Sequence, residues 1–491
     1  MRYLSIKSLL AGLVCFPLIS AAEESPNIVV FLVDDMGVMD TSVPFLTDEG
    51  GKPVVHPLNT WYQTPNMKRL AKQGVRFSNF YAQSVCSPTR ASIMTGQNAT
   101  RHGTTQFIKP ETDNRGEFGP PKWNWKGLTK ECVTLPRVLQ KNGYRTIHVG
   151  KGHFGPFKSI GAEPLNLGFD VNIAGSAIGL PRSYIGTYGK GTSRAVPGLE
   201  DYHNSGTFLT DALTIEATKA VDDAVEKKKP FYLYMSHYAV HGPFTPDPRF
   251  IEKYLNKGHK KSTAAFAALI EGMDKSLGDL LDHLEKIGEA ENTLILFMGD
   301  NGTACPGHKG KPSAPLRSQK GSCYEGGTRV PFIAAWAKPS ATSAVQKNWP
   351  IPAGVIQPQA IGTVMDIFPS VLELTKTPAP KNHTIDGSSL KTLLSGKPDP
   401  QREQAFLMHF PHKHRSSYFT SLRLGDWKLI YFYLKENHCE LYNLKTDPSE
   451  STNLAEKHPK ELKRMLGEMK QRLAREDALY PVDATGKELK P

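Results

Sequence analysis

Hydrophobic residues along the chain form a few uninterrupted runs, separated by segments in which they recur every three or four positions. The two most apolar runs, residues 27–33 and 293–298, carry no charged side chain. Such runs are typical of strands buried on both faces of a parallel sheet. Further strands are predicted at 75–81, 146–149 and 230–237, and helices at 64–74, 135–143, 210–227 and 262–287. Because strands alternate with helices, the pattern predicts an α/β fold with a large, mostly parallel sheet sandwiched by helices.

The C-terminal part has a different pattern. Residues 350–400 are rich in proline, contain a predicted helix at 361–374, and connect the α/β part to the last ninety residues or so. Beyond residue 400, closely spaced short strands, a Gly425-Asp426 turn signal and one basic helix predict a smaller α+β domain with an antiparallel sheet. The strands are expected at 405–410, 417–424, 428–433 and 440–444, and the helix at 459–475.

The N-terminus has the composition of a secretory signal peptide. A basic start precedes an apolar centre at residues 9–19, and small residues come after it. That centre is too short to span a membrane, and no later stretch is apolar enough to do so. We therefore expect a signal peptide at 1–22, a soluble exported protein (periplasmic or secreted), and domains at 23–400 and 401–491.

Composition narrows the picture only a little. Hydrophobic residues make up 39% and charged residues 22% of the 491 positions, as in a soluble globular protein. The net charge of +12 suits an anionic polysaccharide, but an ordinary solvated surface would explain it equally. Nothing indicates a nucleic-acid partner, and the oligomeric state is open. Segment 155–206 has little periodicity, so we expect it to line the active site and carry specificity.

The six cysteines leave their pairing open. Cys15 lies in the signal peptide, and Cys86 stands in a motif with chemistry of its own. The four others, which allow three complete pairings, are Cys132, Cys305, Cys323 and Cys439. Cys305 and Cys323 bracket one loop, so a disulfide between them is the first expectation. No C-x-x-C pair suggests a zinc site.

Polar side chains stand at the ends of the two most apolar strands. Asp34 and Asp35 come directly after the first, and Asp300 and Asn301 end the second. Adjacent buried carboxylates repel each other unless a cation lies between them. Ligands bind outside the carboxyl ends of parallel strands, so these oxygens are expected at one edge of the sheet. An all-oxygen set suits calcium far better than zinc.

Residues 84–96 combine a cysteine with the start of a predicted helix. Pro88 suits a first helical turn, which places Cys86 at or just before the helix N-terminus. Unpaired N–H groups and the positive end of the helix dipole favour an anion there. Arg90, about one turn further on, can supply a fixed cation at the same place.

The pattern C-x-P-x-R, followed by a hydrophobic pair and Thr-Gly, resembles the signature of the type I sulfatases of the alkaline phosphatase superfamily. The resemblance implies that a maturation enzyme oxidises Cys86 to formylglycine, whose hydrate is the nucleophile. It also implies one calcium ion per chain. Its ligands would be Asp34, Asp35, the modified Cys86, Asp300 and Asn301.

Other motifs extend the resemblance over nearly the whole mature chain. Lys151 and His153 match a sulfate-binding pair, although the residue between them is commonly aromatic and here is Gly152, which leaves more room. His241, just before x-Pro, matches a catalytic histidine, whereas His237 is expected to pack. Lys320 lies in a loop that resembles the family's lysine loop. The implied catalytic residues are Cys86, Arg90, Lys151, His153, His241 and Lys320.

The resemblance implies a sulfuric ester hydrolase acting on a sulfated carbohydrate, similar to exported bacterial polysaccharide sulfatases. Galactose-type residues of algal galactans or glycosaminoglycans are favoured. Trp123 and Trp125 would stack on sugar rings or fill structural roles. Two alternatives stay open: a phosphate or phosphonate monoester hydrolase of the same superfamily, and a non-catalytic glycan-binding protein in which Cys86 stays a thiol. A two-zinc phosphatase needs further histidine and aspartate ligands, which are not found beside Asp300-Asn301.

Overall fold

A computed structural model describes residues 25–436 and 438–491. The predicted signal peptide, residues 1–22 with Cys15, lies outside the described residues. Within the described part, no helix is both long enough and apolar enough to cross a membrane.

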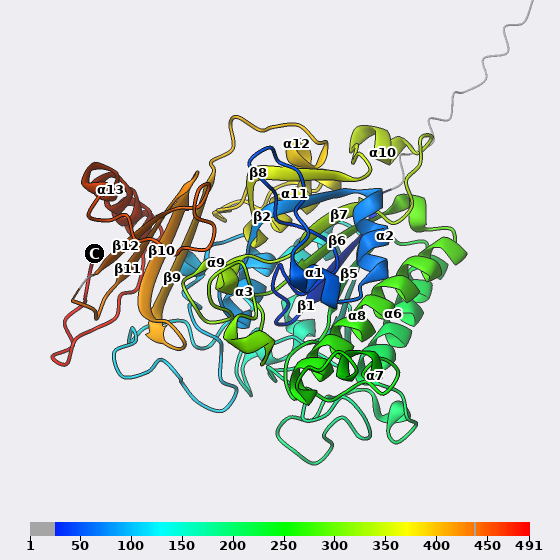
Figure 1. Ribbon diagram of the computed structural model, residues 1–491. Helices are drawn as coiled ribbons and strands as arrows, with labels where there is room; N and C mark the ends of the chain where they lie inside the picture. The colour runs from blue at the N-terminus through cyan, green and yellow to red at the C-terminus, as the bar shows by residue number, and fades with distance from the viewer. Residues whose placement is uncertain (1–24, 437) are drawn as a thin grey trace, which may run out of the picture.

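An eight-stranded sheet forms the centre of the molecule, in the order β4-β3-β5-β1-β6-β7-β2-β8 (Figure 1). All neighbouring strands are parallel except β7, which runs antiparallel to both β6 and β2. The predicted α/β fold with a mostly parallel sheet is therefore confirmed. The strands are β1 Asn27–Val33, β2 Val75–Tyr81, β3 Arg145–Gly150, β4 Val171–Ile173, β5 Phe231–Ser236, β6 Thr293–Gly299, β7 Phe332–Trp336 and β8 Val355–Thr363.

Helices cover both faces of this sheet, and β1 shows why its sequence is apolar throughout. Val29, Phe31 and Val33 face one core, which α2, α6 and α8 complete. Ile28, Val30 and Leu32 face the other, with α3, α5, α11 and α12. The helices are α1 Pro57–Trp61, α2 Pro65–Gln73, α3 Cys86–Thr95, α4 Ala99–His102, α5 Leu135–Lys141, α6 Leu209–Glu226, α7 Glu252–Leu255, α8 Lys261–Lys286, α9 Glu325–Thr328, α10 Ala344–Asn348, α11 Ile367–Leu374, α12 Lys391–Leu394 and α13 Pro459–Arg475.

The C-terminal part forms a second, antiparallel sheet in the order β12-β11-β10-β9, as predicted. Its strands are β9 Ala405–Lys413, β10 Ser417–Leu424, β11 Trp427–Phe432 and β12 Cys439–Asn443. Leu407 and Leu422 face α13, whereas Phe406 and Met408 on the opposite face pack on residues of the larger domain such as Tyr81. The small sheet therefore lies between α13 and the larger domain (Figure 1).

The proline-rich connector contributes more structure than its sequence indicates. The helix predicted at 361–374 begins too early: β8 runs to Thr363, a 3₁₀ turn spans Val364–Asp366, and only then does α11 start. Strand β8 is an edge strand that pairs only with β2, with a register shift between Phe77 and Asn79. Proline is tolerated in such an irregular edge strand, which explains why the composition concealed it.

Candidate active site

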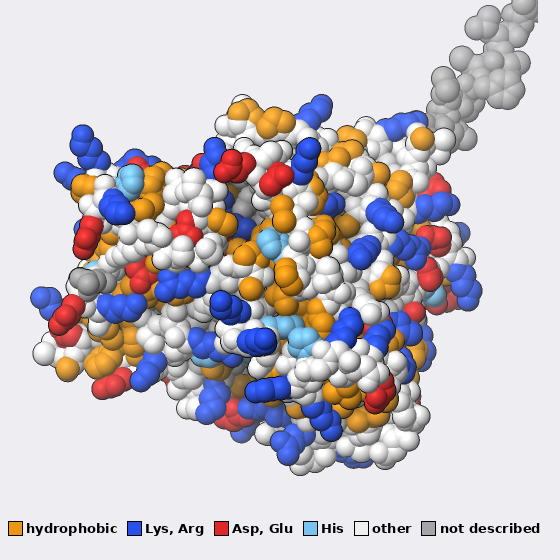
Figure 2. Space-filling view, viewed as in Figure 1, with side chains coloured by type: hydrophobic (Ala, Val, Ile, Leu, Met, Phe, Trp, Pro, Cys, Tyr) orange, Lys and Arg blue, Asp and Glu red, His pale blue; other side chains and the backbone are white. Residues whose placement is uncertain are grey.

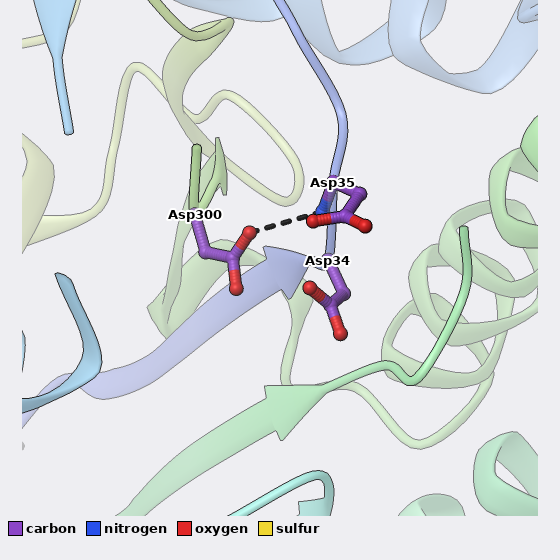
Figure 3. Close-up of side chains that lie close together, drawn as sticks. All are labelled: Asp34, Asp35 and Asp300. Carbon is purple, nitrogen blue, oxygen red and sulfur yellow. Dashed lines mark hydrogen bonds between the residues drawn. The ribbon is translucent and has the colours of Figure 1, made fainter. Parts of the chain in front are cut away.

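Three aspartates lie at the carboxyl ends of β1 and β6, which are neighbours in the sheet (Figure 3). One oxygen from each of Asp34, Asp35 and Asp300 lies within 4.8 Å of the other two, and all three residues are buried. The Asp35 N–H donates to Asp300 Oδ1 at 3.0 Å. The structure thus brings together at one sheet edge the carboxylates that the two apolar strands were expected to deliver.

Two buried oxygens in this cluster have no hydrogen-bond partner among the residues that the structure describes. Asn301 donates its Nδ2 to Asp35 Oδ1 at 2.9 Å and to the Gly302 carbonyl, which leaves its own Oδ1 unpaired. Asp34 Oδ1 is likewise unpaired. Buried acceptors without a donor are costly, so they indicate an absent ligand. Carboxylate and amide oxygens are ligands that a hard divalent cation prefers, so the residues fit such an ion.

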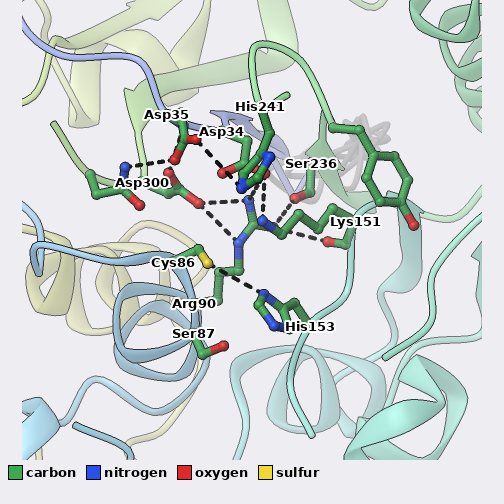
Figure 4. Close-up of polar contacts among 12 residues, drawn as sticks. Asp34, Asp35, Cys86, Ser87, Arg90, Lys151, His153, Ser236, His241 and Asp300 are labelled. Carbon is green, nitrogen blue, oxygen red and sulfur yellow. Dashed lines mark hydrogen bonds and ion pairs between the residues drawn. The ribbon is translucent and has the colours of Figure 1, made fainter. Parts of the chain in front are cut away.

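Each aspartate also has a basic partner, and Figure 4 labels two of these partners, Arg90 and Lys151. Arg90 Nε and Nη2 donate to Asp300 Oδ2 at 3.1 and 2.8 Å. Lys151 Nζ lies 2.5 Å from Asp34 Oδ2, and Lys320 Nζ pairs with Asp35 Oδ1. Three carboxylates therefore face three cationic side chains within the protein. A bound divalent cation would make this site strongly attractive to an anion.

Arg90 links three elements around this cluster. It lies in α3, and its Nη1 donates to Ser236 Oγ at the end of β5 (2.5 Å) and to the Lys151 carbonyl just after β3 (3.0 Å). The guanidinium is fully buried and has partners on several sides. The sequence motifs did not single out Ser236, although its place at the end of a predicted strand was a usable signal.

Cys86 is the first residue of α3, where the motif predicted a helix start. Its Sγ lies 3.4 Å from His153 Nδ1, and His153 Nε2 lies 2.6 Å from the Ile108 carbonyl. A carbonyl only accepts, so Nε2 carries the proton of a neutral ring and Nδ1 is an acceptor facing residue 86. His153 (φ 59°) and Asp35 (φ 61°) both have left-handed backbones, which Asp and His tolerate better than most residues.

Burial controls the protonation of these groups. It raises the pKa of the Cys86 thiol despite the opposing effect of Lys151 and Lys320, so the thiol is not activated as a thiolate. Burial also lowers the pKa of His153 well below its ordinary value. Burial and the Asp34 carboxylate raise the pKa of Asp300 to about 6, against the influence of Arg90. Burial would raise the pKa of Asp35 too, but Lys320, His241 and Lys151 hold it below its usual range.

His241 borders an open cavity, unlike the deeper His153. Its Nε2 lies 3.6 Å from Asp35 Oδ2, and its Nδ1 lies 3.0 Å from the Gly242 carbonyl. Burial lowers its pKa to about 4, although Asp35 opposes that shift. The cavity measures about 490 Å³ and is lined by Asp35, His241, Gly242, Phe244, Ala304, Cys305, Pro306, Gly307, Gly310, Pro312, Gln319, Lys320, His414 and Arg415.

His237 packs in the core, as expected, and is not part of the site. Its ring centroid lies 5.0 Å from that of Phe31, and its Nε2 bonds Ser276 Oγ at 3.0 Å. Trp123 also has a structural role: its Nε1 donates to Asp113 at 2.8 Å, and the residue is 5% exposed. The Trp125 Nε1 reaches the Lys109 carbonyl at 3.4 Å, and the Lys126 ammonium lies 4.2 Å from the Trp125 ring centroid.

The room expected at Gly152 is not there. A Cβ at this position would lie 2.9 Å from the Ser176 carbonyl oxygen, so the backbone of the 155–206 segment occupies the space. The same segment supports His153, whose ring a Cβ on Gly179 would meet at 2.7 Å. Tyr184 donates to the His241 carbonyl at 2.7 Å. Segment 155–206 therefore packs behind the site residues and contributes none of the residues that line the cavity.

The expected disulfide between Cys305 and Cys323 is wrong, because all five cysteines of the described chain are free. The two thiols face different surroundings. Cys305 is buried in the core with Tyr62, whereas Cys323 packs with residues of the C-terminal sheet and lies 3.5 Å from Ser416 Oγ. A loop that brackets two cysteines in sequence does not bring their side chains together.

Comparison with known proteins agrees with this arrangement. Residues 26–377 match the family model described as Sulfatase, and residues 319–478 match the one described as N-sulphoglucosamine sulphohydrolase, C-terminal. A sulfatase of Formosa agariphila is 28% identical over 92% of this chain and 90% of its own. The N-acetylgalactosamine-6-sulfatase of Mus musculus is 30% identical over 77% of this chain and 68% of its own.

A solved structure extends the likeness to three dimensions. The crystal structure of Ps i-CgsB has a TM-score of 0.71 and 26% sequence identity, covering 91% of this chain and 93% of that chain. A second crystal structure shows Ps i-CgsB in complex with k-i-k-neocarrahexaose.

Proposed function

The chain belongs to the sulfatase family and is a sulfuric ester hydrolase, and we propose that it removes sulfate from a sulfated carbohydrate by means of a formylglycine at position 86 and one calcium ion. The observation that carries the proposal is the buried, charge-balanced cluster beside Cys86, with two ligand oxygens left unpaired. A sulfate ester is an anion, so its hydrolysis needs positive charge around the transferring group.

Calcium is supported by the chemistry of its expected ligands. Asp34, Asp35, Asp300 and Asn301 offer only oxygen, and no other group of three or more His, Cys, Asp or Glu side chains in the described chain could hold a metal. When bound, the ion supplies positive charge for the sulfate and for residue 86. A cation on the carboxylates would also free the ammonium groups of Lys151 and Lys320 to bind sulfate oxygens.

Formylglycine at position 86 is supported by the state of the unmodified thiol. The raised pKa of Cys86 and the acceptor nitrogen of a neutral His153 do not generate a thiolate at neutral pH. Calcium also prefers oxygen to sulfur. An aldehyde hydrate at residue 86 supplies one oxygen to attack sulfur and a second to expel the sulfate afterwards.

The two histidines face different parts of the reaction. His153 Nδ1 points at residue 86, so we assign it the role of accepting a proton there. His241 lies at the cavity, where the alcohol leaves, so we assign it the role of proton donor to the leaving oxygen. An anion bound beside His241 would raise its lowered pKa and let it carry that proton.

A carbohydrate substrate is supported by the relatives. One is an N-acetylgalactosamine-6-sulfatase, and the structurally similar Ps i-CgsB binds a neocarrahexaose. These names favour a galactose-type sulfated glycan, for which the cavity of about 490 Å³ beside Asp35 offers room. A panel of glycans sulfated at different positions, including both chain ends and internal residues, would fix the sulfate position and distinguish endo from exo attack.

The proposal is tested by measuring sulfate release from such a panel of sulfated mono- and oligosaccharides, with an aryl phosphate and an aryl phosphonate as competitors. We expect sulfate release to exceed release from either phosphorus ester by orders of magnitude. Cys86→Ala is the matched control, and it should release nothing while keeping its fold. Faster release from a phosphorus ester would assign the chain to the alternative activity, and binding without release from any ester would make it a glycan-binding protein.

A further inference from the structure

Part of the cavity wall comes from the C-terminal domain. His414 and Arg415 lie in the connection between β9 and β10 and line the cavity with Lys320. Neither residue stands in a motif of the sequence, so the fold alone brings them to the site. The C-terminal sheet therefore completes the cavity that holds the substrate.

This connection is fixed to the loop that carries Lys320. The Arg415 Nη1 donates to the Lys320 carbonyl at 3.0 Å, and the Ser416 N–H donates to the Gly321 carbonyl at 3.0 Å. Gly321 has φ +76°, and a Cβ there would lie 2.0 Å from the His414 ring. Only glycine allows this approach, so His414 and Arg415 are held in place at the cavity.

The segments around the cavity are basic and carry almost no acid. Residues 241–246, 304–312, 319–320 and 412–417 contain no Asp or Glu, and Asp35 is the one acidic residue that lines the cavity. Lys309 and Lys311 flank the lining residue Gly310 and are exposed. Figure 2 shows basic and histidine side chains gathered near the centre of this face. More positive charge is present than a single sulfate requires.

We propose that Arg415, supported by His414, binds a second anionic group of the substrate, so that the enzyme acts on glycans that carry a further sulfate or carboxylate beside the sulfate removed. Arg415 is exposed, and apart from the Lys320 carbonyl its guanidinium has no hydrogen-bond or ion-pair partner in the described chain. A guanidinium with free N–H groups can bind sulfate or carboxylate through two parallel hydrogen bonds. This inference rests on the proposed function.

The test compares wild type with Arg415→Gln on two glycans that share the sulfate to be removed, one of which also bears a second anionic group. A charge-assisted hydrogen bond contributes about 1.5–3 kcal/mol, so we expect kcat/KM of the variant to fall about ten- to a hundredfold more on the doubly anionic glycan than on the singly sulfated one. A second sulfate and a uronate carboxylate, tested separately, distinguish the two sources of the charge.

Arg464→Gln is the matched control, because it removes one positive charge from the exposed face of helix α13. The ratio of its kcat/KM values on the two glycans should be the same as in wild type. An equal loss on both glycans in Arg415→Gln would show that Arg415 only positions Lys320 through its carbonyl, and would overturn the proposal. No loss on either glycan would overturn it as well.

Binding separates this inference from the proposed function. Calorimetric titration of Cys86→Ala with the same two glycans, with and without Arg415→Gln, measures the contact without turnover. In one outcome wild type releases no sulfate, but Arg415→Gln still weakens binding of the doubly anionic glycan more than binding of the singly sulfated one. The proposed function would then fail, and this inference would stand. If sulfate were released and the double variant bound both glycans like Cys86→Ala, the inference alone would fail.

Discussion

Each buried aspartate of the site has a cation of its own: Asp34 pairs with Lys151, Asp35 with Lys320 and Asp300 with Arg90. All of these residues were expected from the sequence: the strand ends indicate the aspartates, the start of the predicted helix indicates Arg90, and the resemblance to the type I sulfatases implies the two lysines. The sequence did not predict that the lysines would contact the aspartates, because that depends on where three separate loops meet. A cation bound as proposed would therefore compete with two lysines for the same carboxylates.

Replacing Lys151 with Met tests this competition. Lys151 is fully buried, and a unit charge about 4 Å from another contributes about 4 kcal/mol at an effective dielectric constant of about 20. We therefore expect Lys151→Met to abolish turnover and to bind calcium at least about tenfold more tightly than wild type, as measured by titration calorimetry. Weaker calcium binding would mean that Lys151 mainly holds Asp34 in position for the ion.

Single-residue expectations failed where neighbours remote in sequence decide the outcome. The space beside Gly152 is filled by Ser176, and Cys305 and Cys323 face separate cores. Both expectations used local sequence only. A glycine leaves the space of a side chain empty, but at Gly152 the backbone of another segment fills that space.

Among the elements, the strongest sequence signals belonged to strands buried on both faces. Strands β1 and β6 match their predicted positions almost residue for residue. Burial on both faces requires apolar side chains throughout, and their sequences have that pattern. Strands β7 and β8 were missed: β7 is short and antiparallel, and β8 contains Pro358 within the proline-rich connector. Their pairing partner β2 lies far away in the chain, so no local pattern specifies them.

A buried ion cluster joins helix α9 to the C-terminal sheet. Lys428 in β11 lies 2.9 Å from Glu325 and 2.8 Å from Glu450, and all three are buried. Glu325 begins α9, which comes directly after the Lys320 loop. The cluster therefore couples the position of that loop to the C-terminal domain. Burial and the nearby Glu325 carboxylate raise the pKa of Glu450 to about 7, although Lys428 opposes that shift.

Lys428→Met should destabilise the protein markedly. Removing one partner of a buried ion pair costs about 3–5 kcal/mol, because the remaining charge is left unpaired. Here that charge is Glu450, since Glu325 keeps Arg329 at 2.9 Å. Thermal melts should show a clear loss of Tm, together with reduced sulfate release after mild heating. Lys435→Met is the control, since that side chain is 52% exposed and its ion pair with Glu440 spans 3.7 Å. Equal Tm values for the two variants would show that the cluster contributes little.

At the scale of the whole molecule, buried titratable groups such as His412 and Glu476 make the stability depend on pH. His412 bonds Thr105 at 2.8 Å and the Arg115 carbonyl at 3.1 Å, and burial lowers its pKa to about 3. A histidine in the unfolded chain has a pKa of about 6.5. Between these values the unfolded chain binds more protons, so this group makes stability fall as pH falls. Glu476 has the opposite sign: burial raises its pKa to about 7, so its effect lowers stability as pH rises from about 4.5.

Substitutions separate the two contributions. Wild type should lose stability relative to His412→Gln as the pH is lowered from 7 to 4, measured by the difference between their Tm values. For Glu476→Gln the dependence should be opposite: the Tm of this variant should rise relative to the Tm of wild type as the pH is raised from 4.5 to 7. Parallel pH curves for wild type and both variants would contradict these assignments.

The molecule as a whole explains why function was easier to predict than specificity. The aspartates lie at strand ends and Cys86 at a helix start, which sequence patterns reveal. The resemblance to the type I sulfatases implied Lys151, His153, His241 and Lys320. Part of the cavity wall comes from a connection in the second domain, and only docking of the two domains places His414 and Arg415 there. The reaction chemistry could therefore be predicted from the sequence, whereas the shape and charge of the cavity could be described only once the fold was known.

The proposed reaction depends above all on residue 86 acting as formylglycine beside a cation site, and mass spectrometry of the peptide that contains residue 86 decides whether it does. The peptide would be taken from enzyme whose sulfate release per molecule has been measured. We expect a residue in which sulfur is replaced by oxygen and two hydrogens are lost, in a proportion that rises and falls with activity from one preparation to another. Fully active enzyme with an intact Cys86 thiol would contradict the proposed chemistry.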